Sequence, residues 1–244
     1  MSTFTESAST AFGLIGGADP VLRSIVARSL SVSGTATAIG CVAGVVLGAW
    51  LGVARFRGRD AVLTVLNTFL ALPSVVVGLV IYLLLSRTGP LGFLGWLFSF
   101  QAMVLAQAAL VLPVCTALTR QVVEDVERAQ GEQLASLGAG SFLRSAILAF
   151  DQRFALLTVL IACFGRAVSE VGAVMIVGGN IDGFTRVMTT AIALETSKGD
   201  LPLALALGSV LLSVVLLLNA AIALLARWRG ASHERPLAMD GAAA

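Results

Sequence analysis

Two ionisable side chains, Arg166 and Glu170, interrupt an otherwise apolar stretch of the sequence, FGRAVSEVGAVMIVGG. A charged group inside a bilayer costs at least about 2.5–3.5 kcal/mol on insertion scales, and such groups are commonly functional. Their i, i+4 spacing allows an ion pair along one side of a helix, with the small polar Ser169 beside it. Two interpretations have equal weight: the pair fixes helix packing, or it faces a transport pathway and gates it. A paired Arg166 offers less net positive potential, which disfavours direct coordination of an anion.

The segment that follows, residues 178–199, combines glycines with hydrogen-bond donors. Gly178, Gly179 and Gly183 allow backbone N–H groups to converge on an anion. Donor side chains lie among them, one charged and four neutral: Arg186, Asn180, Thr185, Thr189 and Thr190. The pattern predicts an anion pathway on the outer side of a membrane. A surface loop whose glycines only form turns is an equal alternative.

A third segment, residues 132–151, is polar and helix-prone between two long apolar runs, and reads EQLASLGAGSFLRSAILAFD. Leu134 and Leu137 share a helical face, and Gly138 interrupts the helix. From Phe142 onward, apolar residues again recur at helical spacing. Two amphipathic helices joined by a glycine hinge predict a docking element for a soluble partner. A solvated helical connector is the alternative interpretation.

Composition indicates which elements must position these residues. Of the 244 residues, 57% are hydrophobic and 12% charged, whereas a soluble domain carries about 25% charge. A helix needs about 20 apolar residues to span a bilayer. The sequence therefore predicts an all-α polytopic membrane protein with five spans, at residues 32–54, 61–86, 100–119, 154–177 and 201–226.

Small and helix-breaking residues mark particular places in these spans. Glycine recurs at every fourth position from Gly40 to Gly52, a bare stripe that lets another helix approach closely and that we interpret as packing within one subunit. Pro73 and Pro113 each remove a backbone hydrogen bond and predict a kink. Because broken helices often border the pathway of a transporter, Pro73 and the adjacent Ser74 are candidate pathway residues.

The placement of arginines predicts the orientation. The arginine-rich loops after the first and third spans lie on the same side as the tail after the fifth, and this side is predicted to be cytoplasmic. The N-terminus is then outside and the C-terminus inside. Residues 1–30 are predicted to form an extracytoplasmic tail and an interfacial helix. Residues 31–226 form the transmembrane domain, with a cytoplasmic loop at 120–153, and residues 227–244 a cytoplasmic tail.

Residue content argues against several other functions. The only histidine is His233, and the three cysteines, Cys41, Cys115 and Cys163, lie in separate apolar runs. We interpret them as small buried hydrophobes, so no metal centre or disulfide is predicted. The net charge of +2 is too small to indicate nucleic-acid binding. The sequence has no Gly-x-x-x-x-Gly-Lys-[Ser/Thr] loop, so we expect no cofactor on this chain and no ATP hydrolysis by it.

Two groups of residues resemble a known family. Glu132, Ala135 and Gly138 are similar to the cytoplasmic coupling motif of ABC importer permeases, which begins Glu-Ala-Ala and has glycine at its seventh position. Gln133 and Leu134 stand where that motif has its two alanines. A more specific resemblance, to permeases of tungstate-specific importers, relatives of the molybdate and sulfate permeases, is carried by residues 72–79, 86–92, 165–173, 178–181 and stretches within 185–199.

The resemblance implies a type I ABC importer permease in a bacterial inner membrane. It implies a homodimer with two cytoplasmic ATPase subunits, which bind ATP and Mg²⁺, and an extracytoplasmic oxyanion-binding protein. Tungstate is the implied substrate, with molybdate or sulfate as alternatives. The residues expected to couple transport to the ATPase are Glu132, Leu134, Ala135, Leu137, Gly138 and Phe142. The alternative of another class is an ATP-independent transporter or channel that uses Arg166 and Glu170. Five spans without an evident pair of broken helices instead fit a half-channel that needs a second copy.

Overall fold

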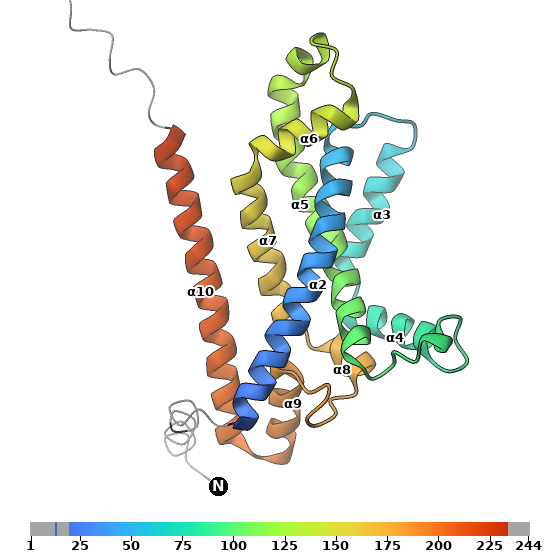
Figure 1. The fold of residues 1–244 in the computed structure, drawn as a ribbon, viewed down its shortest axis with the longest axis vertical. Coiled ribbons are helices and arrows are strands. Elements are labelled where there is room, and N and C mark those ends of the chain that lie inside the picture. The colour runs from blue at the N-terminus through green and yellow to red at the C-terminus, as the bar shows by residue number, and fades with distance from the viewer. Residues whose placement is uncertain (1–12, 14–19, 234–244) are drawn as a thin grey trace, which may run out of the picture.

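The computed structural model describes Gly13 and residues 20–233, with side-chain environments up to Leu224. Within that part of the chain, helices and turns account for the fold, and no strand is present (Figure 1). The predicted all-α class is confirmed. In chain order the elements are α2 (Pro20–Val53), α3 (Arg59–Ala71), α4 (Ser74–Leu85), η1 (Gly92–Leu94), α5 (Phe100–Ser136), α6 (Ser141–Asp151), α7 (Arg153–Val168), α8 (Gly172–Gly178), α9 (Met188–Lys198) and α10 (Leu201–His233).

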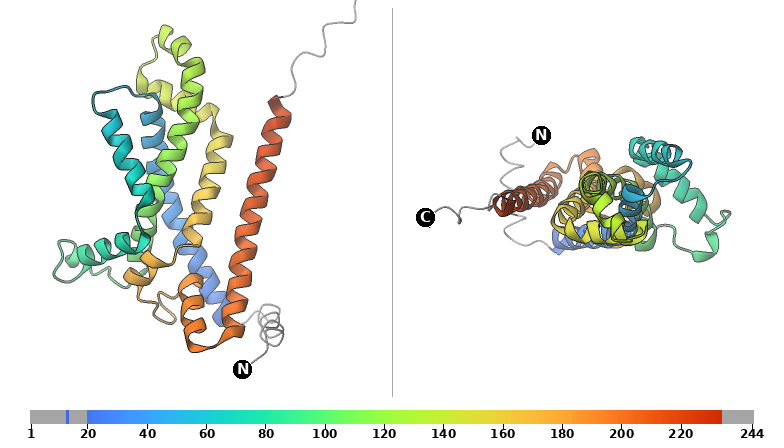
Figure 2. Two further views of the ribbon diagram at one scale, coloured as in Figure 1. Left: turned by 180° about the vertical axis from the view of Figure 1, so that it is seen from behind. Right: turned by 90° about the horizontal axis from the view of Figure 1, so that it is seen from above.

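The long helices α2, α5, α7 and α10 run roughly along one direction, α6 crosses one end of the bundle, and α4, α8 and α9 gather at the other end (Figures 1 and 2). Three described helices, α2, α5 and α10, are long and apolar enough to cross a membrane. The number rises to five if each bent pair, α3 with α4 and α6 with α7, counts as one span. The five predicted spans lie at the upper end of this range of three to five.

The centre of the bundle is the contact between α2 and α5, and the glycine stripe makes it close. A Cβ atom built on Gly48 would lie 2.5 Å from the carbonyl oxygen of Thr116, and one on Gly44 would lie 2.7 Å from the Cβ of Cys115. Such separations leave no room for a side chain. The two backbones therefore touch along the stripe, as predicted, and the packing that results holds the bundle together.

Replacing Gly48 by alanine is therefore expected to destabilise the protein by about 1–3 kcal/mol, because the new methyl group meets backbone that cannot rotate away. The matched control is Gly34→Ala in the same helix, where the nearest atom to a new Cβ is a Phe164 ring carbon at 4.0 Å. That variant should be neutral or more stable, since alanine favours helices over glycine. Thermal unfolding in detergent measures the stability of both variants. Equal unfolding midpoints would mean that α2 and α5 are not closely packed at Gly48.

The N-terminal part of α2 differs from its prediction. A separate interfacial helix before residue 31 was predicted, but α2 runs without interruption from Pro20 to Val53. Leu22 and Ile25 are buried against Val168 and residues of α9 and α10. Their apolar face is therefore covered by protein, which favours continuation of one long helix.

Two predicted spans are broken. The span predicted at residues 61–86 bends by 99° between α3 and α4, where Leu72 and Pro73 have extended backbone. The kink predicted at Pro73 is thus a sharp turn, whereas α5 continues through Pro113. The span predicted at 154–177 ends early, at Val168. Ser169 donates its hydroxyl to the carbonyl oxygen of Gly165 at 2.8 Å, and this side-chain bond competes with the backbone at the last turn of α7.

Candidate functional site

The predicted docking segment folds as the C-terminal end of α5, a turn, and α6 (Figure 1). Gly138 makes the turn with a φ of 81°, in the left-handed region that favours glycine. Leu137, Phe142 and Phe150 beside it are 83%, 72% and 72% exposed. A row of exposed apolar side chains at one end of the bundle is typical of an interaction surface.

The opposite face of α6 attaches this surface to the bundle. Leu148 is buried in a cluster with Val53 of α2 and Val123 of α5. Leu134, predicted to contact a partner, is partly buried against the same cluster. Two further predicted coupling residues are exposed: Glu132 and Ala135. The docking segment therefore has an exposed outer face and an inner face packed against α2 and α5.

A charge network beneath the docking segment was not recognised in the sequence. Glu124 of α5 is buried. Its carboxylate forms ion pairs with Arg59 and Arg128, each at 3.3 Å, and with Arg55 at 3.8 Å. Arg120, one turn before Glu124, pairs with the same carboxylate. One carboxylate thus joins the loop after α2, the start of α3 and a charged part of α5.

This network lies outside the apolar part of α5. The helix has 37 residues and is about 55 Å long at 1.5 Å per residue, whereas the hydrocarbon core of a bilayer is about 30 Å thick. Burial by itself would raise the pKa of Glu124, but Arg59 and Arg120 outweigh it and hold the pKa below its ordinary value. Glu124 is therefore ionised at neutral pH.

A second ion pair connects α5 directly to α6. Arg144 of α6 lies 3.2 Å from the carboxylate of Glu127, and both side chains are largely buried. Because Glu127 lies one turn after Glu124, the docking segment, the loop after α2 and the end of α5 form one connected unit. These ion pairs tie α6 to the long helices in this conformation.

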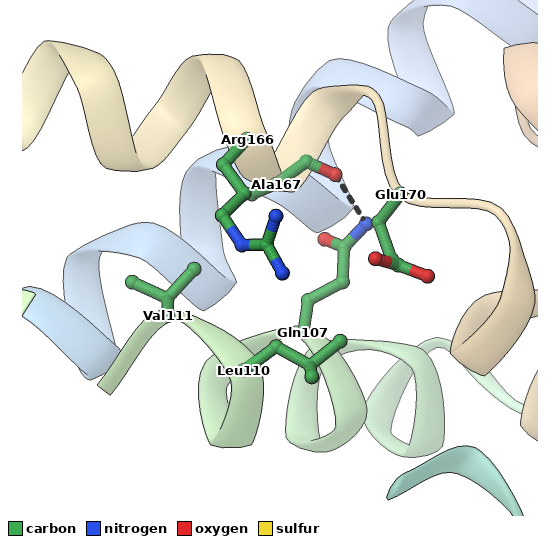
Figure 3. Close-up of a pocket in the computed structure, with 6 residues that line it drawn as sticks. All are labelled: Gln107, Leu110, Val111, Arg166, Ala167 and Glu170. Carbon is green, nitrogen blue, oxygen red and sulfur yellow. Dashed lines mark hydrogen bonds between the residues drawn. The ribbon is translucent and has the colours of Figure 1, made fainter. Parts of the chain in front are cut away.

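Near the other end of the bundle, α5 and the end of α7 form a small pocket (Figure 3). Its polar side chains are Gln107, Arg166 and Glu170, and the Gln107 amide lies between the other two. Gln107 donates from Nε2 to the carbonyl oxygen of Ala167 at 2.9 Å, while its Oε1 is buried without a hydrogen-bond partner. Gln107 was missed in the sequence because a lone amide within an apolar run gives no spacing signal.

The predicted ion pair between Arg166 and Glu170 is wrong. Because α7 ends at Val168, the helical spacing that would bring the two side chains together is lost. Glu170 instead accepts a hydrogen bond from the backbone N–H of Ala173 at 3.2 Å, at the start of α8. Arg166 is exposed and forms no ion pair with the residues whose side chains the structure describes. Its positive charge is therefore available to an anion.

The two breaks in the helices lie against each other. A Cβ on Gly172, at the start of α8, would lie 2.8 Å from Oγ of Ser74, at the start of α4. A Cβ on Gly78 would lie 2.7 Å from Cα of Ala173. These contacts bring the start of α4, at the candidate pathway residue Ser74, against the start of α8.

The glycine-rich segment after α8 lies at the end of the bundle opposite α6 (Figure 1). Its donors are engaged within the fold. Thr185 donates to the carbonyl oxygen of Gly178, and Asn180 donates to that of Thr190 at 3.3 Å. Arg186 pairs with Asp182 at 3.1 Å and lies 4.0 Å from Glu195. In this conformation these groups hold the segment in shape, and Gly179 turns the chain with a φ of 68° beside the Phe98 ring.

The geometry is an all-helical bundle with a tethered docking segment at one end and an available arginine beside broken helices. The family described as "Binding-protein-dependent transport system inner membrane component" matches residues 44–230, most of the chain. The chain belongs to this family. The predicted recognition of an ABC importer permease is thereby confirmed.

Individual relatives of this permease support the same assignment. The tungstate uptake system permease protein TupB of Peptoclostridium acidaminophilum is 42% identical over 223 residues, covering 91% of this chain and 97% of the relative. A protein of the same name from Campylobacter jejuni is 38% identical over 68% of this chain and 69% of its own length. The sulfate transport system permease protein CysW of Escherichia coli K12 is more distant, at 31% identity over 89% of this chain and 77% of the relative.

Proposed function

We propose that this chain is the permease subunit of an ATP-driven importer for a tetrahedral oxyanion, with tungstate as the preferred substrate. The assignment of tungstate as the substrate rests on the 42% identity to a tungstate uptake permease over almost the full length of both chains. Molybdate and sulfate are the alternatives, since permeases named for them are more distant relatives. Membership of a binding-protein-dependent family disfavours the ATP-independent transporter or channel.

The proposed assembly is a homodimer with two cytoplasmic ATPase subunits and an extracytoplasmic binding protein. In this arrangement the exposed face of α6 sits on an ATPase subunit, so the N-terminus lies outside and the C-terminus inside. ATP and Mg²⁺ are held by those subunits. Only 17% of the most apolar part of α10 is buried within one chain, against 67% in α5, so this helix is open to lipid and to a partner copy.

The proposed mechanism is alternating access. Nucleotide-driven closure of the ATPase subunits moves α6, and the two ion-pair networks pass the movement to α2, α3 and α5. The helices then rearrange around the breaks at Pro73 and Ser169, opening the pathway to one side at a time. Arg166 lines this pathway and supplies the positive charge that a dianion requires.

Replacing Arg166 by glutamine should lower tungstate uptake by about 10–100-fold. A hydrogen bond to a charged group contributes about 1.5–3 kcal/mol, and each 1.4 kcal/mol is a factor of ten. The conservative variant Arg166→Lys retains the charge and should keep most of the uptake. Initial rates in vesicles that contain the complete complex measure both. Equal losses in the two variants would indicate a packing role.

The substrate is tested by competition. The chain is reconstituted in vesicles with an ABC ATPase subunit and an oxyanion-binding protein from the same organism, and ATP-dependent uptake of radioactive tungstate is measured against added molybdate or sulfate. Molybdate should compete more strongly than sulfate, because it is closer to tungstate in size. Uptake that needs neither ATP nor the binding protein, and follows an ion gradient, would overturn the proposed function.

A further inference from the structure

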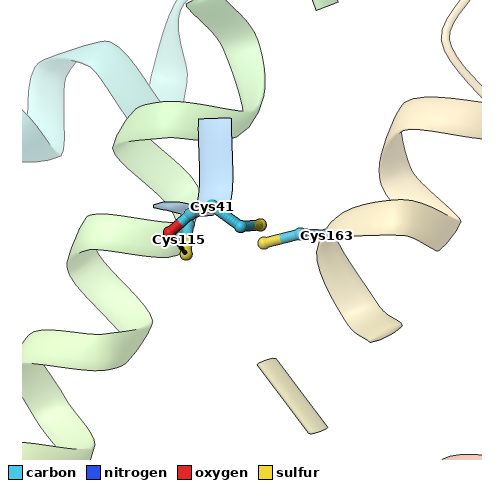
Figure 4. Close-up of side chains that lie close together, drawn as sticks. All are labelled: Cys41, Cys115 and Cys163. Atoms are coloured by element: carbon cyan, nitrogen blue, oxygen red, sulfur yellow. Dashed lines mark hydrogen bonds between the residues drawn. The ribbon is translucent and has the colours of Figure 1, made fainter. Parts of the chain in front are cut away.

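The three cysteines of the chain, which were predicted to be small buried hydrophobes without a metal centre, meet at one point in the bundle. Cys41 of α2, Cys115 of α5 and Cys163 of α7 place their sulfur atoms within 4.8 Å of one another (Figure 4). All three side chains are buried, and all three are free thiols. Apolar periodicity predicted their burial but not their convergence, because that depends on how three helices pack.

The dimensions of the cluster suit one metal ion. Three atoms that all lie within 4.8 Å of one another fit inside a circle of radius about 2.8 Å. A zinc–sulfur bond is about 2.3 Å long, so movements of a few tenths of an ångström bring the three sulfur atoms to bonding distance. Larger soft cations need smaller movements still.

The chemistry of the surroundings limits which ion fits. The cluster is enclosed by apolar residues, among them Val111 and Val159, where a net charge is costly. A divalent ion held by two thiolates and one neutral thiol carries no net charge. Binding then proceeds as an exchange, in which the ion displaces two thiol protons to solvent and no electron transfer is involved.

All three cysteines belong to one buried apolar cluster. Cys115 contacts the carbonyl oxygen of Cys41 at 3.8 Å and Oγ1 of Thr119 at 3.9 Å, which are weak sulfur contacts within and between helices. Neither contact brings Cys163 of α7 to the same point. We propose that these three cysteines form a binding site for a soft divalent d¹⁰ cation, of the class of Zn²⁺ and Cd²⁺.

The site has a structural consequence that goes beyond the proposed transport function. A bound ion would link α7 to the closely packed pair α2 and α5. Cys163 lies one turn before Arg166, so the link would also fix the end of α7 next to the pocket of Figure 3. The folded chain should therefore become more resistant to heat when the ion is bound.

The proposal is tested by titrating the reduced, purified full-length chain in detergent with CdCl₂. Thiolate-to-cadmium charge transfer is followed in the near ultraviolet, and proton release with a pH indicator. Because the sequence contains only these three cysteines, every such absorption arises at the cluster. We expect one Cd²⁺ per chain, about two protons released, and a higher unfolding temperature.

Single and combined variants make the result decisive. Loss of an outer-sphere partner lowers metal affinity about 10–100-fold, and loss of a ligand in Cys163→Ala should lower it by at least as much. Cys41→Ala/Cys115→Ala/Cys163→Ala should show no charge-transfer absorption, and Cd²⁺ should not raise its unfolding temperature. Unchanged affinity in Cys163→Ala would overturn the site. So would absorption that appears only after the wild-type chain is unfolded in SDS, because the folded cluster would then be closed to metal.

Discussion

Glu124→Ala is expected to destabilise the folded chain by about 3–5 kcal/mol, because it leaves buried arginines without a counter-charge. The side chains of Arg59 and Arg120 are only 14% and 18% exposed, and both pair with this carboxylate. Arg55 and Arg128 are largely exposed and contribute little, since water screens them. Thermal or denaturant unfolding in detergent measures the loss.

The matched control is the neighbouring acid. Asp125 is exposed and forms no ion pair with the described residues, so Asp125→Ala should change stability by less than about 0.5 kcal/mol. Similar unfolding midpoints for Glu124→Ala and Asp125→Ala would mean that the network does not hold the helices together.

The dependence on pH follows from the lowered pKa of Glu124. A carboxyl group whose pKa is lower in the folded than in the unfolded state stabilises the fold above its unfolded pKa. That contribution is lost as the pH falls through the folded pKa. The stability difference between wild type and Glu124→Gln should therefore be full at neutral pH and should shrink in acid.

Gly138→Pro should reduce ATP-driven uptake by more than about tenfold, which corresponds to about 1.4 kcal/mol of lost coupling. Proline requires a φ near −65°, whereas Gly138 has a φ of 81° and donates its N–H to the carbonyl oxygen of Ala135 at 3.0 Å. The substitution therefore reshapes the turn that orients Phe142. Hydrolysis by the ATPase subunits should continue, but it should no longer drive transport.

Gly140→Pro is the control for this experiment. Gly140 already has a φ of −67° and precedes the first residue of α6, so proline fits its backbone. Uptake and ATP hydrolysis are measured in the same vesicles for both variants. If ATP hydrolysis drives uptake as well in Gly138→Pro as in Gly140→Pro, the turn does not transmit force from the ATPase to the permease.

Local patterns in the sequence predicted the features that depend on neighbouring residues. The glycine stripe from Gly40 to Gly52 predicted the close contact of α2 with another helix. The hinge at Gly138 and the exposed apolar face that includes Phe142 followed from spacing along the chain. The turn at Pro73 was expected as a kink, because proline removes a hydrogen bond wherever it stands.

Features that depend on contacts between distant segments were not predictable in this way. Periodicity continued the fourth span past Ser169, since nothing in an apolar run shows that Glu170 will accept a hydrogen bond at the start of the next helix. The arginines around Glu124 were recognised only as signs of orientation. Residues 120, 124 and 128 are spaced like an ion-paired helix face, a signal that could have identified part of the network.

The most direct measurement is the accessibility of the docking segment from each side of the membrane. Ser141 is exposed at the start of α6, and the native cysteines are buried, so Ser141→Cys gives one reactive site. We predict that a membrane-impermeant thiol reagent leaves this cysteine unmodified in intact spheroplasts and modifies it after lysis. Modification in intact spheroplasts would place α6 outside the cell and contradict its role as the contact for a cytoplasmic ATPase.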